Sequence, residues 1–510
     1  MAIDNGCFVS RYRPYDGISV YWQTVSVTLA RRIFSATSVL TASGMLARML
    51  SLITMPVLTR LLAPNAYGIA AIAGTMISLI CMIAVAGMDM SYARAYHANR
   101  RPAGSAVEIF AWRYSLVSGA IAGVAATLVW WLIVADLLSL PSYLAPWIGC
   151  GVLLSVVSIM AQTYARLHNR YGKLAVSTIV AGLAMALVSV GVALWWRQDE
   201  LALILSIVIG YLVPIAILGG PAVHRLCKAS DLTITERIDV TRIGLAGIVT
   251  APMFWILTSM DKWFLGYFDD SASVGIYSVG YSIGILGMIV NNAIQSVWLP
   301  EVAREYERSG DDARVHLSRI AEWLVSALAL VWLAIAAIGG DIVRLMAGPA
   351  FQGAAEVIPY IAAGVLFYGI SQLANGTLLL KHKLHYAMWW WLAAALLCVA
   401  LNFVLVPIVG RLGAAITQSI AFLFVAGGIE FGAQKVFPLQ IRVRRLGFVL
   451  AGIGVLGVLM SRPWSVSPVQ SLLGKMPFGL LTMYVVGRLI APHVLQRFSQ
   501  RVWHSLSLKR

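Results

Sequence analysis

The chemistry available to this chain lies in a few polar and charged side chains inside long apolar segments. Arg48 is the most prominent, because it falls near the middle of the apolar segment 35–59. A bilayer core needs about 20 apolar helical residues, so Arg48 is expected near mid-depth, where a guanidinium costs at least ~2.5–3.5 kcal/mol. Small and polar residues share its helical face: Thr37, Thr41, Gly44 and Ser51. We therefore expect Arg48 to face a bundle interior or water. A structural arginine that pairs across helices or snorkels to an interface is the alternative.

Other polar side chains lie inside the later apolar segments, and together they predict a water-filled lumen. The candidate substrate-binding residues are Arg48, Lys262, Asn291, Gln295, Asn375 and Gln418. Two cations in this set favour an anionic passenger. For any single amide, however, a hydrogen bond between helices, worth roughly 0.6 kcal/mol on average, is the simpler interpretation.

Two carboxyl groups, Asp261 and Glu430, are candidates for ion coupling. Removal from water favours the neutral form of a carboxyl group, which is what a proton-carrying site requires. The competing interpretation is that Asp261 pairs with a nearby cation, such as Lys262 or Arg48, and serves only the fold.

Enzyme signatures are missing from the sequence. It contains no Gly-x-x-x-x-Gly-Lys phosphate loop, its five cysteines form no C-x-x-C motif, and its eight histidines are scattered. We therefore predict no catalytic residue, no metal site and no cofactor. The net charge of +16 comes from basic residues placed singly or in pairs between apolar segments, so nucleic acid is not an expected partner.

The composition defines the fold class. The chain has 510 residues, of which 60% are hydrophobic and 12% charged, and its mean hydropathy is +0.81. Too few charges remain to cover a soluble surface, so we predict an all-α polytopic membrane protein. Hydropathy predicts about fourteen transmembrane (TM) helices, at 35–59, 67–87, 110–135, 145–165, 174–196, 201–220, 243–265, 274–298, 320–339, 357–379, 386–407, 412–431, 446–461 and 477–495.

The distribution of basic residues predicts the orientation. Most of the 38 Lys and Arg residues fall in alternate loops on the side of the N-terminus, which places both termini in the cytoplasm. The first 33 residues are polar and lack the apolar core of a signal peptide. The adjacent Asp269 and Asp270 lie in a short external loop, where a turn is the expected role.

The two halves of the chain resemble each other, which predicts an internal repeat. Gly68 matches Gly275 at an offset of 207 residues, and Tyr96 matches Tyr306 at an offset of 210. We expect a 12-helix core of two parallel six-helix bundles around a central cavity. The predicted parts are a cytoplasmic tail 1–33, an N-terminal bundle 34–228, a linker 229–242, a C-terminal bundle 243–435, and two extra helices with a cytoplasmic tail at 436–510.

Three motifs carry a family resemblance. Pro56–Gly68 reads PVLTRLLAPNAYG, Asp261–Tyr277 contains DKWFLG followed by VGIY, and Asn402–Ala415 reads NFVLVPIVGRLGAA. With these motifs the chain resembles bacterial oligosaccharide flippases (Wzx-type, polysaccharide transporter family) of the multidrug/oligosaccharidyl-lipid/polysaccharide exporter superfamily. The resemblance covers the chain from about Ser35 to Phe431.

The resemblance implies a function in the bacterial cytoplasmic (inner) membrane. It implies flipping of undecaprenyl-diphosphate-linked oligosaccharide units from the inner to the outer leaflet by alternating access, for exopolysaccharide, capsule or O-antigen synthesis. A proton or sodium gradient, rather than ATP, would drive the process. The expected partners are the lipid-linked oligosaccharide, the phospholipid bilayer, and a polysaccharide polymerase with chain-length and export proteins.

Other functions stay open at the level of the sequence. A peptidoglycan lipid-precursor flippase or a multidrug exporter of the same superfamily would carry similar motifs. A membrane-embedded glycan polymerase or glycosyltransferase is less favoured, because it needs a substantial outer loop and the predicted outer loops are short.

Overall fold

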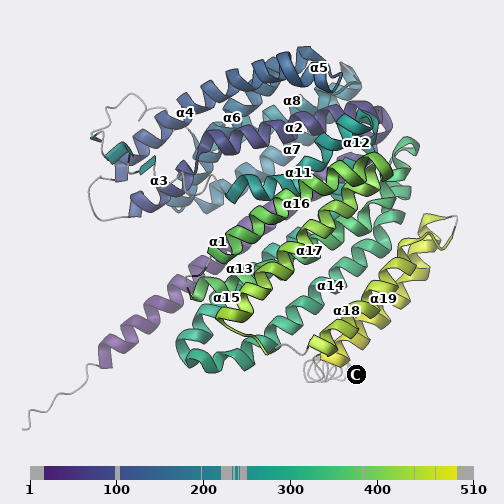
Figure 1. Cartoon of the computed structure of the whole chain (residues 1–510). Coiled ribbons are helices and arrows are strands. Elements are labelled where there is room, and N and C mark those ends of the chain that lie inside the picture. Colours follow the sequence, from purple (N-terminus) through teal and green to yellow (C-terminus); the bar gives the residue numbers. More distant parts are fainter. Residues whose placement is uncertain are drawn as a thin grey trace, which may run out of the picture.

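The computed structural model describes residues 16–97, 104–196, 198–219, 232–233, 236–238, 240–241, 250–381, 383, 385–440, 443–465 and 467–490. Every regular element in these ranges is a helix (Figure 1). An apolar environment forces each spanning segment to satisfy its backbone hydrogen bonds internally, which a helix does. The prediction of an all-α polytopic membrane protein is therefore confirmed.

The helices form two lobes and a C-terminal pair. The N-lobe consists of α1 (Asp16–Leu61), α2 (Pro64–Val85), α3 (Met88–His97), α4 (Gly104–Val129), α5 (Ala135–Leu137), α6 (Ala145–Leu167), α7 (Tyr171–Trp195) and α8 (Leu201–Leu218). The C-lobe consists of α11 (Thr250–Phe268), α12 (Ser271–Gly284), α13 (Gly287–Ser309), α14 (Ala313–Met346), α15 (Ile358–Leu380), α16 (His385–Val409) and α17 (Arg411–Val436). The C-terminal pair is α18 (Val443–Ser461) and α19 (Pro468–Ile490).

Eleven helical runs in the described residues are long and apolar enough to cross a membrane. They cover twelve of the fourteen predicted segments, because the run Ser271–Met346 contains two of them. The other two segments correspond to α11 and to the shorter apolar helix α18. Residues 220, 243–249 and 491–495 of the predicted segments lie outside the described residues, as does half of the linker 229–242.

Two segments differ in detail from the prediction. Helix α1 begins at Asp16, inside the predicted tail, so residues 16–33 continue the first spanning helix. The eighth predicted segment, 274–298, is divided between α12 and α13 at Ile285–Leu286. Hydropathy detects neither feature, because a helix can extend beyond its apolar core and a break of two apolar residues leaves the average unchanged.

Local sequence explains where the helices at the inter-lobe contact begin. Pro64 opens α2, and proline suits a first helical position because its nitrogen has no hydrogen to leave unbonded. The Asp270 side chain caps α12 by accepting a hydrogen bond from the Ser273 backbone nitrogen at 2.6 Å. The turn role predicted for this aspartate is confirmed.

The packing of the two lobes follows one plan. In the N-lobe, α6 packs against α4 and α8, and α7 against α1. In the C-lobe, α15 packs against α14 and α17, and α16 against α11 in the corresponding way. The two lobes therefore have the arrangement that an internal repeat predicts, and the boundaries assigned to the bundles from the sequence stay predictions.

The C-terminal pair packs on α14, on the side of the C-lobe away from the N-lobe (Figure 1). A buried ion pair joins it there: Lys475 Nζ lies 2.7 Å from Asp341 Oδ2, and each side chain is 1% exposed. The same lysine donates to the Ala337 carbonyl, and Ser471 donates to Asp341. These contacts attach α19 to α14.

A hydrophobic core joins the lobes at one end. It includes Ile72 and Ile77 of α2 together with Val274 of α12 and Ala414 of α17. Large apolar side chains such as Leu187 lie exposed on the outside of the lobes, as expected for a surface that faces lipid.

Candidate translocation site

The two lobes meet where the first turns of α2 and α12 cross. A Cβ atom on Gly68 would lie 1.7 Å from the Ser271 carbonyl oxygen, and one on Gly275 would lie 1.9 Å from the Pro64 carbonyl oxygen. Only glycine allows backbones to approach so closely. At the offset of 207, Gly68 matches Gly275 and Pro64 matches Ser271, so the contact is symmetric between the repeats. The lobes are closed against each other at this end.

Arg48 lies on α1 and lines an N-lobe cavity of about 600 Å³. Its side chain is exposed, and it forms no ion pair with a carboxylate in the described ranges. Gln418 of α17, in the opposite lobe, is buried and is not among the residues that line this cavity. Its role beside Arg48 stays a prediction.

Hydroxyl groups make up most of the polar lining of this N-lobe cavity. They come from five helices: Ser51, Thr54, Tyr67, Ser158, Thr178, Ser189, Ser206 and Tyr211. Gln162 also lines it and donates to the Ser158 hydroxyl. Arg48 is the cation among these lining residues, so the cavity presents one positive charge in a polar, neutral wall.

Asp261 and Lys262 are buried between α11 and α12. Tyr277 donates to Asp261 Oδ2, and the Lys262 backbone nitrogen donates to Oδ1 at 2.9 Å. The Lys262 ammonium lies 3.7 Å from Asp261 Oδ1 and 4.1 Å from the centre of the Tyr281 ring. Asp261 thus pairs with a nearby cation, which is the interpretation that competes with ion coupling. The pairing leaves the Lys262 side chain, which is 6% exposed, little freedom to reach a passenger.

Three predicted amides lie in the C-lobe rather than at the Arg48 site. Asn291 and Gln295 lie one turn apart on α13, and Asn375 lies on α15. Gln295 and Asn375 line a separate cavity of about 480 Å³. Of the six predicted residues, Arg48 lines one cavity and Gln295 and Asn375 line the other, while Lys262, Asn291 and Gln418 line neither.

Glu430, the second predicted coupling residue, lies near the end of α17. Its Oε1 accepts a hydrogen bond of 2.6 Å from Gln434, and its side chain is half-buried. None of the cavities described here is lined by Glu430. Its coupling role stays a prediction.

Sequence reasoning did not assign roles to the aromatic residues around this site. Tyr277 and Tyr281 surround the Asp261–Lys262 pair, and Trp255 crosses the lobe interface by donating to the Ser78 hydroxyl at 2.9 Å. Tyr277 is the last residue of the Asp261–Tyr277 motif, which gave no sign of a contact between the two residues. That contact depends on how α12 crosses α11.

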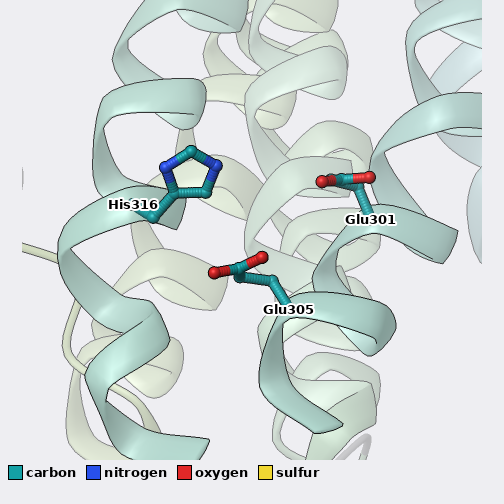
Figure 2. A group of neighbouring side chains, drawn as sticks. All are labelled: Glu301, Glu305 and His316. Carbon is teal, nitrogen blue, oxygen red and sulfur yellow. The ribbon is translucent and has the colours of Figure 1, made fainter. Parts of the chain in front are cut away.

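A further group of side chains, Glu301, Glu305 and His316, lies at the junction of α13 and α14 (Figure 2). Their potential ligand atoms lie within 4.8 Å of one another. However, Arg304 already donates to Glu301 at 2.7 Å, and His316 is exposed. We assign no metal role to this group.

A third cavity, about 910 Å³, lies between α14, α15 and α18. Its lining is mainly apolar, with Glu356 and Arg462 among its few charged residues. It contains none of the predicted site residues.

The many helices long and apolar enough to cross a bilayer define a multi-pass membrane protein, and cavities lie inside its two lobes. The sequence matches the polysaccharide biosynthesis protein family over residues 33–306, more than half of the chain, and the chain belongs to that family. A search of curated protein sequences finds no match.

Solved structures show the same fold. The lipid II flippase MurJ in its inward closed conformation has a TM-score of 0.68 at 12% identity, covering 89% of this chain and 99% of its own. A point mutant of the Vibrio cholerae MATE transporter VcmN has a TM-score of 0.54 at 12% identity, covering 81% and 98%. An outward-facing MATE family transporter of the MOP superfamily has a TM-score of 0.53 at 13% identity, covering 79% and 96%. These neighbours are flippases and transporters rather than enzymes, and at such identities they establish the fold.

Proposed function

We propose that this protein flips undecaprenyl-diphosphate-linked oligosaccharide units across the bacterial cytoplasmic membrane. The observation that carries the proposal is Arg48: a cation inside a spanning helix, exposed on a cavity wall and without a carboxylate partner in the described chain. A structural arginine would be paired, because an uncompensated charge in a span is costly. An anionic passenger supplies the missing partner.

The diphosphate head suits this arginine. Its oxygens can accept two parallel hydrogen bonds from one planar guanidinium, and such charge-assisted pairs are stronger than neutral hydrogen bonds. Gln418, buried on α17, is the candidate contact from the C-lobe. Lys262 contributes to the positive potential only in part, since Asp261 offsets its charge.

The closed α2–α12 contact supports alternating access. The distribution of basic residues predicts that this end of the molecule faces the outside of the cell, and in that orientation the contact of the lobes would close the cavity to the outside. The lipid-linked unit would enter from the cytoplasmic side and leave after the two lobes separate at Gly68 and Gly275. A proton or sodium gradient acting through Asp261 or Glu430 would drive the cycle.

A peptidoglycan lipid-precursor flippase is the second candidate function. It is favoured by the TM-score of 0.68 with a lipid II flippase, which exceeds the 0.54 and 0.53 of the two transporters. The polysaccharide biosynthesis family match favours the oligosaccharide instead. If the passenger is the oligosaccharide, a polysaccharide polymerase and chain-length or export proteins would act on the flipped product.

The test is the location of the lipid-linked glycan after deletion of the gene in its own host. We expect undecaprenyl-linked oligosaccharide to accumulate, protected from an external glycosidase in spheroplasts and cleaved in inverted vesicles. Wild-type protein should restore surface polysaccharide and Arg48→Ala should not. Accumulation of peptidoglycan precursor in place of the oligosaccharide would establish the second candidate. Normal surface glycan in the deletion strain, with no accumulation of either lipid-linked precursor, would refute both.

The topology has its own test. Single cysteines at positions 65 and 271, replacing Asn65 and Ser271, should react with an impermeant thiol reagent from outside. Cysteines replacing Asn99 and Asp311 should react only in inverted vesicles. Finding positions 65 and 99 on the same face would refute the orientation.

A further inference from the structure

The C-lobe cavity of about 480 Å³ has a lining unlike that of the Arg48 cavity. Three aromatic rings reach it from three helices: Phe254 of α11, Tyr368 of α15 and Trp391 of α16. Amides reach it from α13 and α15. No acidic or basic side chain is among its described lining residues. A ligand of this cavity should therefore be neutral.

The amides of this cavity lack partners. Gln295 Nε2 and Asn375 Oδ1 are buried and make no hydrogen bond, and neither does Oδ1 of Asn291, one turn before Gln295. Asn291 is fully buried. Buried donors and acceptors in native proteins are nearly always paired with protein or water, so amides without a protein partner beside a cavity are available to a polar ligand. The unsatisfied atoms are a donor and acceptors, which matches hydroxyl groups, since each of these both donates and accepts.

The aromatic rings form one continuous group. The centre of the Phe254 ring lies 5.3 Å from that of Tyr368 and 6.1 Å from that of Trp391, and the last two are 6.2 Å apart. Aromatic faces are electron-rich. They attract the polarised C–H groups on the face of a sugar ring, while amides bond the hydroxyl groups at its edge. A lipid chain would leave the amides unbonded.

We propose that this C-lobe cavity is a subsite for a neutral sugar residue of the passenger's glycan. The inference rests on the proposed function, in which Arg48 holds the diphosphate. The volume lies within the range of about 300–1,000 Å³ typical of ligand pockets. Gln295 and Asn375 bond the sugar hydroxyl groups, and Trp391, Tyr368 and Phe254 contact the ring. The two recognition tasks are thereby divided between the lobes, with charge read by the N-lobe and sugar identity by the C-lobe.

Two probes separate the tasks in calorimetric titrations of the purified full chain. One is inorganic pyrophosphate. The other is the repeat-unit oligosaccharide of the host's surface polysaccharide, freed of lipid and phosphate. The variant Gln295→Leu/Asn375→Leu should lose at least tenfold in affinity for the oligosaccharide and bind pyrophosphate as the wild type does. Arg48→Ala should show the reverse pattern.

Asn292→Leu is the matched control, because it makes the same change on α13 at an exposed position that does not line the cavity. It should bind both probes normally. Pyrophosphate binding also shows whether a variant is folded. If the double variant no longer binds pyrophosphate, the single variants Gln295→Met and Asn375→Leu are tested in its place.

The outcomes are distinguishable. Unchanged oligosaccharide affinity in the Gln295 and Asn375 variants overturns the sugar subsite. So does a wild-type protein that binds pyrophosphate but not the oligosaccharide, and both results leave the proposed function standing. Failure of the wild type to bind either probe, together with normal surface glycan in the deletion strain, overturns the proposed function as well.

Discussion

The N-lobe and the C-lobe share a packing plan but differ at equivalent positions. Helices α1 and α11 end at Leu61 and Phe268, and α2 and α12 begin at Pro64 and Ser271, so the offset of 207 holds without a gap. At this offset Arg48 corresponds to Trp255. Trp255 donates from α11 to Ser78 of α2, whereas Arg48 on α1 lines the N-lobe cavity. One repeat bridges the lobes with an indole, and the other places a cation on a cavity wall.

The same offset contrasts Thr54 and Met55 with Asp261 and Lys262. Thr54 and Met55 are uncharged. Asp261 and Lys262 form a buried ion pair that is enclosed by Tyr277 and Tyr281. Of Arg48 and Lys262, the cation without a carboxylate partner in the described chain is therefore Arg48 of the N-lobe. An internal repeat supplies the scaffold, and the differences between its copies supply the site.

A third pair of equivalent positions lies at the opposite end of the lobes. His168 follows α6, and its Nε2 lies 3.2 Å from the Tyr96 hydroxyl. Lys381 follows α15 and donates to the Tyr306 hydroxyl at 2.6 Å. The hydrogen bond with Tyr306, with help from Asp311, raises the pKa of Lys381 above its ordinary value. The C-lobe contact thus favours the charged form of Lys381.

The largest effect is expected from Arg48→Ala. Hydrogen bonds to charged groups contribute about 1.5–3 kcal/mol each, so losing a bidentate pair should cost on the order of 100-fold or more in transport. Arg48→Lys keeps the positive charge but loses the planar guanidinium that donates two parallel hydrogen bonds, so it should be partly active. Surface glycan and membrane abundance should be measured together, with Arg319→Ala, an exposed arginine of α14, as control.

The two interpretations of Arg48 predict different results. A substrate contact predicts normal abundance with lost transport. A structural ion pair predicts loss of protein, restored by neutralising a partner acid. Normal abundance with normal surface glycan would refute the substrate contact altogether.

Much of this could be predicted from the sequence, and the limit is physical. The length of the apolar segments predicted helices that span a bilayer, and the position of Arg48 in its segment predicted a cation inside the membrane. The enclosure of Lys262 could not be predicted, because it depends on how α12 crosses α11 and brings Tyr277 and Tyr281 over the Asp261–Lys262 pair. Likewise, Gln295 and Asn375 were recognised as polar, but their separation from Arg48 is a property of helix packing.

The second prediction tests the symmetry of the closed end. Gly68→Ala and Gly275→Ala each place a methyl group within 2 Å of a backbone oxygen of the other lobe. Both should prevent this closure and reduce transport strongly, at near-normal abundance. A cysteine replacing Ser271 should then react faster with an impermeant thiol reagent.

Gly427→Ala is the matched control, since its Cβ would meet nothing within 4 Å. It should transport normally. If only one of Gly68→Ala and Gly275→Ala impairs transport, the contact is not the symmetric closure described here.

The third prediction concerns the C-terminal pair, which has no counterpart in the N-lobe. Lys475→Met leaves Asp341 as a buried carboxylate, and breaking such a pair typically costs ~3–5 kcal/mol. Membrane abundance and thermal stability should fall, although Arg344, 3.5 Å from Asp341, compensates in part. Lys475→Met/Asp341→Asn should recover most of the loss. No recovery would mean that the ion pair is not what attaches α19 to α14.

The smallest effect is expected at the carboxyl groups assigned to coupling. Asp261→Asn alone would leave Lys262 buried without its counter-charge, so its effect on transport would be confounded by lost protein. The variant Asp261→Asn/Lys262→Met removes both charges and should reach the membrane normally. If Asp261 carries the coupling proton, this variant should lose several-fold in transport and respond less to an imposed proton gradient.

Glu430→Gln keeps an acceptor for Gln434 and isolates the second carboxyl group. Normal transport by both variants across a range of gradients would remove carboxylate coupling from these positions. The charge asymmetry between the lobes would then serve recognition of the passenger alone.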